Sequence, residues 1–178
     1  MNSWHDEFRM RMNSFASTKV QKYHVPVSIK IRVDGGCFHR SCSPQAYKDI
    51  DKALLPSRSN SAIQFEEHES GPELLVYAAI TTAGLTLTAA LINLVTAIIK
   101  ARYDGIKKGD RPREPLELII RGHWRDGEYI EEKILKIPSD TSPNIQQIET
   151  LLQKALQKQN AIEGTVENTS PTQDQDAS

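Results

Sequence analysis

The chain has 178 residues, which is enough for one domain with a hydrophobic core and short tails. Its 22 basic and 23 acidic side chains give a net charge of -1, which excludes a global electrostatic attraction to nucleic acid or anionic lipid. Charged residues make up 25% of the sequence and hydrophobic residues 38%, values typical of a soluble protein and too polar for a polytopic membrane protein.

Residues 1–22 are predicted to form an extension outside the main domain. Ser3 is a candidate cap for a short helix, and the apolar side chains that follow recur at helical spacing. These apolar residues are Trp4, Phe8, Met12 and Phe15. The stripe suits a segment that docks on a partner, and it equally suits a first helix that lies on its own domain. Because no continuous apolar run is present, we expect no secretory signal peptide.

The main domain, residues 23–160, is predicted to begin with a strand. From Val25 to Val33, apolar and polar residues alternate strictly, a pattern typical of a strand with one buried and one solvated face. Asp34-Gly35-Gly36 ends this strand. Ser43-Pro44 then predicts the N-cap and first position of a helix that extends to about Leu55.

The same signals predict the rest of the domain around one long apolar segment. A short strand begins at Ser61 and a third strand at Leu116, and the Asp126-Gly127 turn joins the third to a partner strand that ends near Ile137. A last amphipathic helix extends from Ile145 to about Gln159. Residues 161–178 are polar and are predicted to be disordered.

The segment from Leu74 to Ile99 contains no charged residue, and we predict that it lies in one helix over residues 72–103. At 1.5 Å per residue it would reach roughly 39 Å, enough to cross a bilayer core of about 30 Å. Acidic residues precede it and basic residues follow it, so the positive-inside rule would place the C-terminal half in the cytoplasm. Length and flanking charge therefore suit a membrane span.

The pattern within the segment favours a buried or interface helix instead. Ile80, Leu87, Leu91, Leu94 and Ile98 form an aliphatic ridge, and the opposite side is small and weakly polar. That opposite side contains Thr82, Thr86, Asn93 and Thr96. A single span would also prevent the first strand from pairing with the hairpin, leaving exposed sheet edges on both sides of the membrane. A span in the inner membrane, with the N-terminus outside and the C-terminus inside, remains the alternative.

The predicted order is strand, helix, strand, long helix, strand, strand, helix. Strands with one apolar face need helices on that face alone. The sequence therefore predicts an α+β fold of two layers, with a small sheet covered by helices on one side.

No catalytic constellation, cofactor fingerprint or metal-binding motif is recognised in the sequence. Cys37, His39 and Cys42 lie close together, but no second cluster supplies the remaining ligands of a closed zinc site, so we predict a metal-free loop. A redox pair is conceivable, although the spacing is not C-x-x-C. With only two cysteines, a reducing cytoplasm is the expected compartment.

The remaining polar clusters also favour an unspecialised surface. Glu66 and Glu67 are adjacent in a predicted strand and are expected at a solvated edge. The basic stretch 100–113 lacks interleaved aromatic residues, so no nucleic-acid binding is expected. Trp124, beside the predicted hairpin turn, is the best exposed aromatic candidate for a contact with a partner.

The layout from Val25 to Gln159 resembles the effector-associated constant component family of bacterial conflict systems. The resemblance rests on the order of elements, on Ser70-Gly71-Pro72-Glu73-Leu74 before the long helix, and on Lys100-Ala101-Arg102 at its exit. Relatives have a tryptophan near the end of the long helix, where this chain has Ile98-Ile99. The resemblance implies a small non-enzymatic component, encoded beside effectors such as caspase-like or trypsin-like peptidases, that acts in defence against phage. It transfers no catalytic residues.

We therefore expect a cytoplasmic, non-enzymatic adaptor or regulatory component without a cofactor. Its expected partner is a protein effector encoded nearby or a second copy of the chain. The residues predicted to contact that partner are Trp4, Phe8, Met12, Thr82, Thr86, Asn93 and Trp124. The alternative is a membrane-anchored component with a cytoplasmic C-terminal domain.

Overall fold

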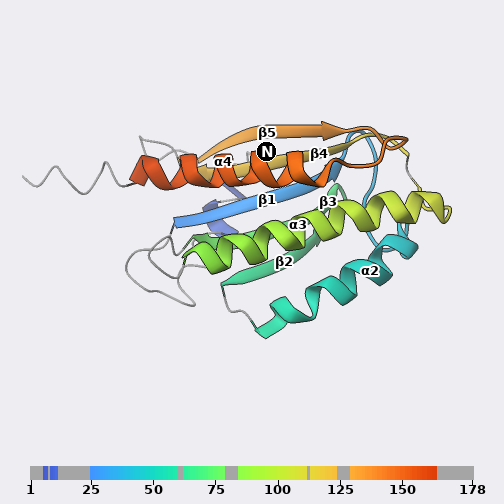
Figure 1. Cartoon of the computed structure of the whole chain (residues 1–178), viewed down its shortest axis with the longest axis horizontal. Helices are drawn as coiled ribbons and strands as arrows, with labels where there is room; N and C mark the ends of the chain where they lie inside the picture. The colour runs from blue at the N-terminus through green and yellow to red at the C-terminus, as the bar shows by residue number, and fades with distance from the viewer. Residues whose placement is uncertain are drawn as a thin grey trace, which may run out of the picture.

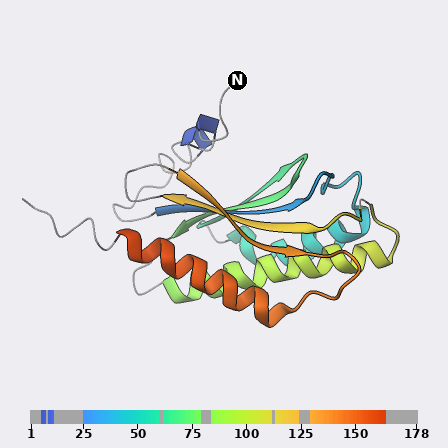
Figure 2. The same cartoon turned by 90° about the horizontal axis from the view of Figure 1, so that it is seen from above.

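A computed structural model describes residues 6, 7, 9–11, 25–59, 62–78, 84–111, 113–123 and 129–163. Five antiparallel strands form one sheet in the order β2-β3-β1-β4-β5, and three helices cover one of its faces (Figures 1 and 2). The elements are β1 (Val25–Val33), α2 (Pro44–Leu54), the short 3-10 helix η1 (Pro56–Ser59), β2 (Ile63–His68), β3 (Gly71–Ala78), α3 (Gly84–Lys107), β4 (Leu116–His123), β5 (Tyr129–Ile137) and α4 (Ile145–Glu163). The predicted α+β fold with a small sheet and helices on one face is confirmed.

The first strand, β1, lies at the centre of the sheet. It pairs with β3 on one side and β4 on the other, so that Ile29 faces both Leu74 and Ile120. The predicted pairing between the strands before and after the apolar segment is thereby confirmed. The β4–β5 hairpin is also confirmed, although its Asp126-Gly127 turn lies outside the described residues.

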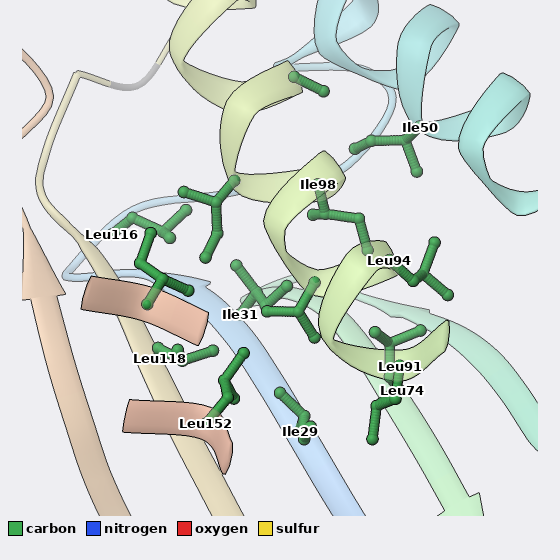
Figure 3. Close-up of a cluster of buried hydrophobic side chains, with 14 of the residues drawn as sticks. Ile29, Ile31, Ile50, Leu74, Leu91, Leu94, Ile98, Leu116, Leu118 and Leu152 are labelled. Carbon is green, nitrogen blue, oxygen red and sulfur yellow. The ribbon is translucent and has the colours of Figure 1, made fainter. Parts of the chain in front are cut away.

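The core lies between the sheet and the helices. Figure 3 shows Ile29 and Ile31 of β1 and Leu118 of β4 pointing toward the helices, where they meet α3 and α4. The helical side chains on this interface include Ile50, Leu91, Leu94, Ile98 and Leu152, all buried. The aliphatic ridge predicted for the long helix is therefore confirmed from Leu91 onward. Thr96, predicted on the weakly polar side, is also buried, and its hydroxyl donates to the Ile92 carbonyl at 2.9 Å.

The prediction of one helix over residues 72–103 is wrong. Its first part is strand β3, and helix α3 begins only at Gly84. Leu74, Leu75 and Val76 are consecutive and all buried, because both faces of β3 are covered. A strand buried on both sides has no apolar–polar alternation, so its sequence matches a buried helix equally well. The sheet thus has one strand more than predicted.

Among the described helices, none is both long enough and apolar enough to cross a membrane.

Two local features fix how neighbouring elements meet. At the β2–β3 turn, Gly71 has φ +135°, and a Cβ there would lie 2.1 Å from the carbonyl oxygen of Ile31. At the α2 N-terminus, Asp110 accepts hydrogen bonds from the backbone N–H groups of Gln45 and Ala46 at 3.0 and 2.8 Å. Ser43 occupies the predicted N-cap position but makes no side-chain cap, because its hydroxyl donates to the Arg111 carbonyl.

The predicted ends of the domain also need correction. Helix α4 continues to Glu163, into the region 161–178 that was predicted to be disordered. Residues 6, 7 and 9–11 are helical, as predicted for the N-terminal extension. Figure 2 shows this short helix on the side of the sheet opposite the other helices.

Candidate functional site

The face of the sheet opposite helices α2–α4, here called the helix-free face, carries buried charges. Ser28 and Glu73 are 0% exposed and Arg121 is 7% exposed. The apolar residues Leu75 and Ile119 are buried on the same face. The predicted solvated face of β1 is therefore wrong at Ser28, whose hydroxyl donates to the buried carboxylate of Glu73.

Two carboxylates lie directly opposite each other on this face. Glu66 of β2 pairs with Glu73 of β3, a like-charged cross-strand pair that would be unfavourable alone. Arg11 of the N-terminal helix compensates, with Nη2 3.0 Å from Glu66 Oε2 and 2.9 Å from Glu73 Oε2. His68 Nε2 lies 3.4 and 3.3 Å from the same two oxygens. We call Glu66, His68 and Glu73 the cation socket.

The second oxygen of Glu73 connects the socket to the rest of the sheet. Ser28 of β1 donates its hydroxyl hydrogen bond to Glu73 Oε1, and Arg121 Nη1 of β4 lies 3.4 Å from the same oxygen. Arg121 Nε in turn donates to Glu131 Oε2 of β5 at 2.9 Å. The ion network therefore extends across all five strands, with Glu73 at its centre.

The environment of Glu73 stabilises its charged form. Burial by itself would raise the pKa, but the contact with the His68 ring, the hydrogen bond from Ser28 and the charges of Arg11 and Arg121 outweigh it, so the pKa of Glu73 lies well below its ordinary value. On the same face, burial and the nearby Arg121 charge lower the pKa of Lys30.

This geometry suits binding of a cationic side chain better than acid–base chemistry. A carboxylate with a strongly depressed pKa stays ionised at neutral pH and is a poor proton donor or acceptor. The Ser28 hydroxyl donates to a carboxylate, whereas an activated serine nucleophile donates to a general base. Glu66 lies on the edge strand β2 and is 26% exposed, in agreement with the predicted solvated edge, and its carboxylate also binds the guanidinium of Arg11.

A second cluster lies in the loop between β1 and α2. Cys37 and Cys42 are joined by a disulfide, which the sequence analysis did not predict. Phe38 between them is fully buried and anchors the loop in the core. The carbonyl of Phe38 accepts a hydrogen bond from the Tyr47 hydroxyl at 3.1 Å.

Among the residues predicted to contact a partner, Asn93 has a described side chain. Asn93 is exposed on α3, and Thr86 lies in the first turn of α3, where its side chain is not described. The other predicted residues fall outside the described ranges. They are Trp4, Phe8, Met12, Thr82 and Trp124.

A small pocket lies between α3 and the β5–α4 connection. Arg102 and Glu114 line it together with apolar residues such as Ile99 and Leu116. Its cavity of about 20 Å³ holds about one water molecule, too little for a metabolite.

Comparison of the chain with protein-family models, curated proteins and solved structures gives no match. The candidate site therefore rests on the geometry of this chain. Its central residue, Glu73, was not predicted as functional because β3 was not recognised as a strand. Unless β3 is recognised as a strand, nothing in the sequence indicates that Glu66 and Glu73 lie opposite each other.

Proposed function

We propose that this chain is a non-enzymatic adaptor that binds a protein partner through the helix-free face of its sheet. The cation socket would accept an arginine or lysine side chain of the partner. In the isolated chain, Arg11 occupies the socket and competes with that partner. The observation that carries the proposal is the seating of Arg11 between Glu66 and Glu73, both directly opposed in the sheet.

The electrostatics support a side chain that binds and leaves. Glu73 is held by its neighbours in the sheet, whereas Arg11 comes from a short helix outside it. Arg11 is 21% exposed and Glu66 is 26% exposed, so the outer half of the socket reaches solvent. A guanidinium from another chain can therefore make the same contacts once Arg11 leaves.

The family resemblance supplies a context for this adaptor. It suggests a cytoplasmic component of a bacterial defence system whose partner is an effector, such as a peptidase, encoded next to it. The partner would present a basic residue on an exposed helix or loop. A second copy of the chain is the other partner that the same surface would accept.

The experiment measures the affinity of the purified chain for each protein encoded beside its gene by isothermal titration calorimetry. Arg11→Ala removes the competing side chain and should tighten binding about tenfold, whereas Glu66→Gln should weaken it about tenfold. Lys154→Ala and Glu149→Gln on α4 make the same changes of charge on the helical side of the molecule.

The two pairs of variants separate the socket from net charge. If Arg11→Ala and Lys154→Ala change the affinity equally, the competition between Arg11 and a partner is refuted. If Glu66→Gln and Glu149→Gln behave alike, the partner binds elsewhere. Analytical ultracentrifugation of the same variants shows whether the partner is a second copy.

A further inference from the structure

The loop from Cys37 to Cys42 holds three metal-ligating side chains outside the ion network. One sulfur atom of each cysteine and one ring nitrogen of His39 lie within 4.8 Å of one another, and all three residues are half-buried. Among the described residues, this is the group of three that is placed to share one metal ion. Two thiolates and an imidazole are the ligands that zinc prefers.

The loop is held in shape by contacts other than the disulfide. The Cys42 carbonyl accepts a hydrogen bond from the Arg111 N–H at 3.0 Å, and the backbone N–H of Cys42 donates to the His39 carbonyl at 3.1 Å. The buried Phe38 side chain fixes the middle of the loop. These contacts do not involve the disulfide, so they would hold the three ligands close together in the reduced loop.

The His39 ring is oriented by Ser41. Its Nδ1 accepts a hydrogen bond from the Ser41 backbone N–H at 3.2 Å and lies 2.9 Å from the Ser41 hydroxyl oxygen. Metal binding at Nε2 needs the other tautomer, in which Nδ1–H donates to the Ser41 hydroxyl. A hydrogen bond from the second ring nitrogen is the usual support for a metal-binding histidine.

We propose that the reduced loop binds one Zn²⁺ through Cys37, His39 and Cys42, with water in the fourth position. A dithiol reductant supplies two electrons and two protons, the S–S bond breaks, and the reductant becomes a disulfide. Each thiol then releases its proton as its sulfur binds the metal. The objection that four protein ligands are lacking applies to a closed structural site, whereas an open site needs only three.

The disulfide and the metal site exclude each other, because both use the same two sulfur atoms. Cys42 lines an open surface depression with Asp110 and Arg111, so a reductant reaches it from solvent. The loop would therefore hold a disulfide under oxidising conditions and zinc under reducing conditions. This inference does not depend on the proposed binding of a partner at the opposite face.

The test titrates Co²⁺ and then Zn²⁺ into the full chain after reduction with a phosphine and removal of the excess. The reduced chain should bind one equivalent of Co²⁺ with a thiolate-to-cobalt charge-transfer band and tetrahedral ligand-field bands. Zn²⁺ should displace the cobalt. The oxidised chain has the same sequence and should bind neither metal. Because no residue is changed, a difference in metal binding between the two forms cannot result from the misfolding of a variant.

Variants assign the ligands. Cys37→Ser, Cys42→Ser and His39→Ala should each weaken Zn²⁺ binding at least tenfold in competition with a chromophoric chelator. His123→Ala removes a histidine of β4, outside the loop and the cation socket, and should leave the Zn²⁺ affinity unchanged. The proposal is overturned if the reduced and oxidised chains bind metal alike, or if His39→Ala and His123→Ala have equal effects.

Discussion

Glu73 is a buried charge at the centre of the candidate site. Its carboxylate is 0% exposed and contacts a serine, a histidine and two arginines from three strands and the N-terminal helix. A buried charge is tolerated only when such partners replace its hydration. The same partners make removal of the charge costly, because Arg11 and Arg121 each lose one of their carboxylate partners in a buried site.

Glu73→Gln should lower the free energy of unfolding by about 2–4 kcal/mol, since it leaves Arg11 and Arg121 without their shared carboxylate. Urea unfolding at pH 7 measures this loss. Glu69→Gln changes an exposed carboxylate in the β2–β3 turn and should cost less than about 0.5 kcal/mol. Equal losses in the two variants would show that the ion network contributes nothing specific.

The depressed pKa of Glu73 also predicts a dependence of stability on pH. Its ordinary pKa is 4.5, which applies in the unfolded chain, and its pKa in the folded chain is lower. The stabilisation is therefore fully present above pH 4.5 and is lost as the pH falls toward the folded pKa. The difference in urea midpoint between the wild type and Glu73→Gln should become smaller as the pH is lowered from 5 to 3. A constant difference would contradict this predicted pH dependence.

At the scale of elements, the contact between α2 and the end of α3 depends on a side chain distant in sequence. Asp110 is 3% exposed and caps two backbone N–H groups at the start of α2. An acidic group at a helix N-terminus also interacts favourably with the helix dipole. This cap fixes the position of α2 relative to α3 and of the preceding cysteine loop.

Asp110→Ala should cost about 1–2 kcal/mol, because two N–H groups of α2 lose their acceptor. Compared with the wild type, hydrogen exchange followed by NMR should be faster at Gln45 and Ala46 of the variant and should change less at the amides of α4. Asp140→Ala, at an exposed position after β5, is the matched control and should leave both measurements unchanged. Unchanged exchange at Ala46 in Asp110→Ala would rule out the cap.

The β2–β3 turn makes a similar demand on a single backbone position. Gly71→Ala should destabilise the fold by more than about 2 kcal/mol, because the added Cβ meets the Ile31 carbonyl in a backbone conformation that alanine rarely adopts. Gly35→Ala tests conformation alone, since φ is +71° there but no atom lies within 4 Å of the added Cβ. It should cost about 1 kcal/mol. Thermal unfolding of both variants distinguishes the cost of the positive φ from the cost of the steric clash with the Ile31 carbonyl.

At the scale of the whole molecule, the N-terminal extension and the main domain have different roles. The described members of the hydrophobic core lie between Val27 and Leu156. Among the described residues of the extension, Arg11 forms ion pairs with Glu66 and Glu73 on the face opposite the helices. The described part of the extension therefore meets the main domain at the cation socket.

Deletion of residues 1–22 should leave a domain that unfolds cooperatively, with a free energy of unfolding lower by about 1–3 kcal/mol from the lost ion pairs. Deletion of residues 164–178, which lie beyond α4, should leave the stability unchanged. Circular dichroism melts of both truncated chains measure the difference. Loss of cooperative unfolding in the first truncation would show that the extension is part of the folding unit.

The sequence by itself determined most of the layers. Strict alternation in β1, the turn residues of the β4–β5 hairpin and the apolar faces of α2 and α4 predict their elements because each has one buried and one more polar side. The ridge of α3 is readable for the same reason. From these elements the sheet with helices on one face follows, as does the need for β1 to pair with the hairpin.

Only the tertiary structure decided the third strand and the site built on it. Leu74, Leu75 and Val76 are buried on both faces of β3, so local pattern cannot distinguish a strand from a helix there. Once β3 pairs with β1 and β2, Glu73 is placed opposite Glu66 and within reach of Arg121, which is 48 residues away in sequence. Such contacts depend on strand register, and register is set by the packing of the whole sheet.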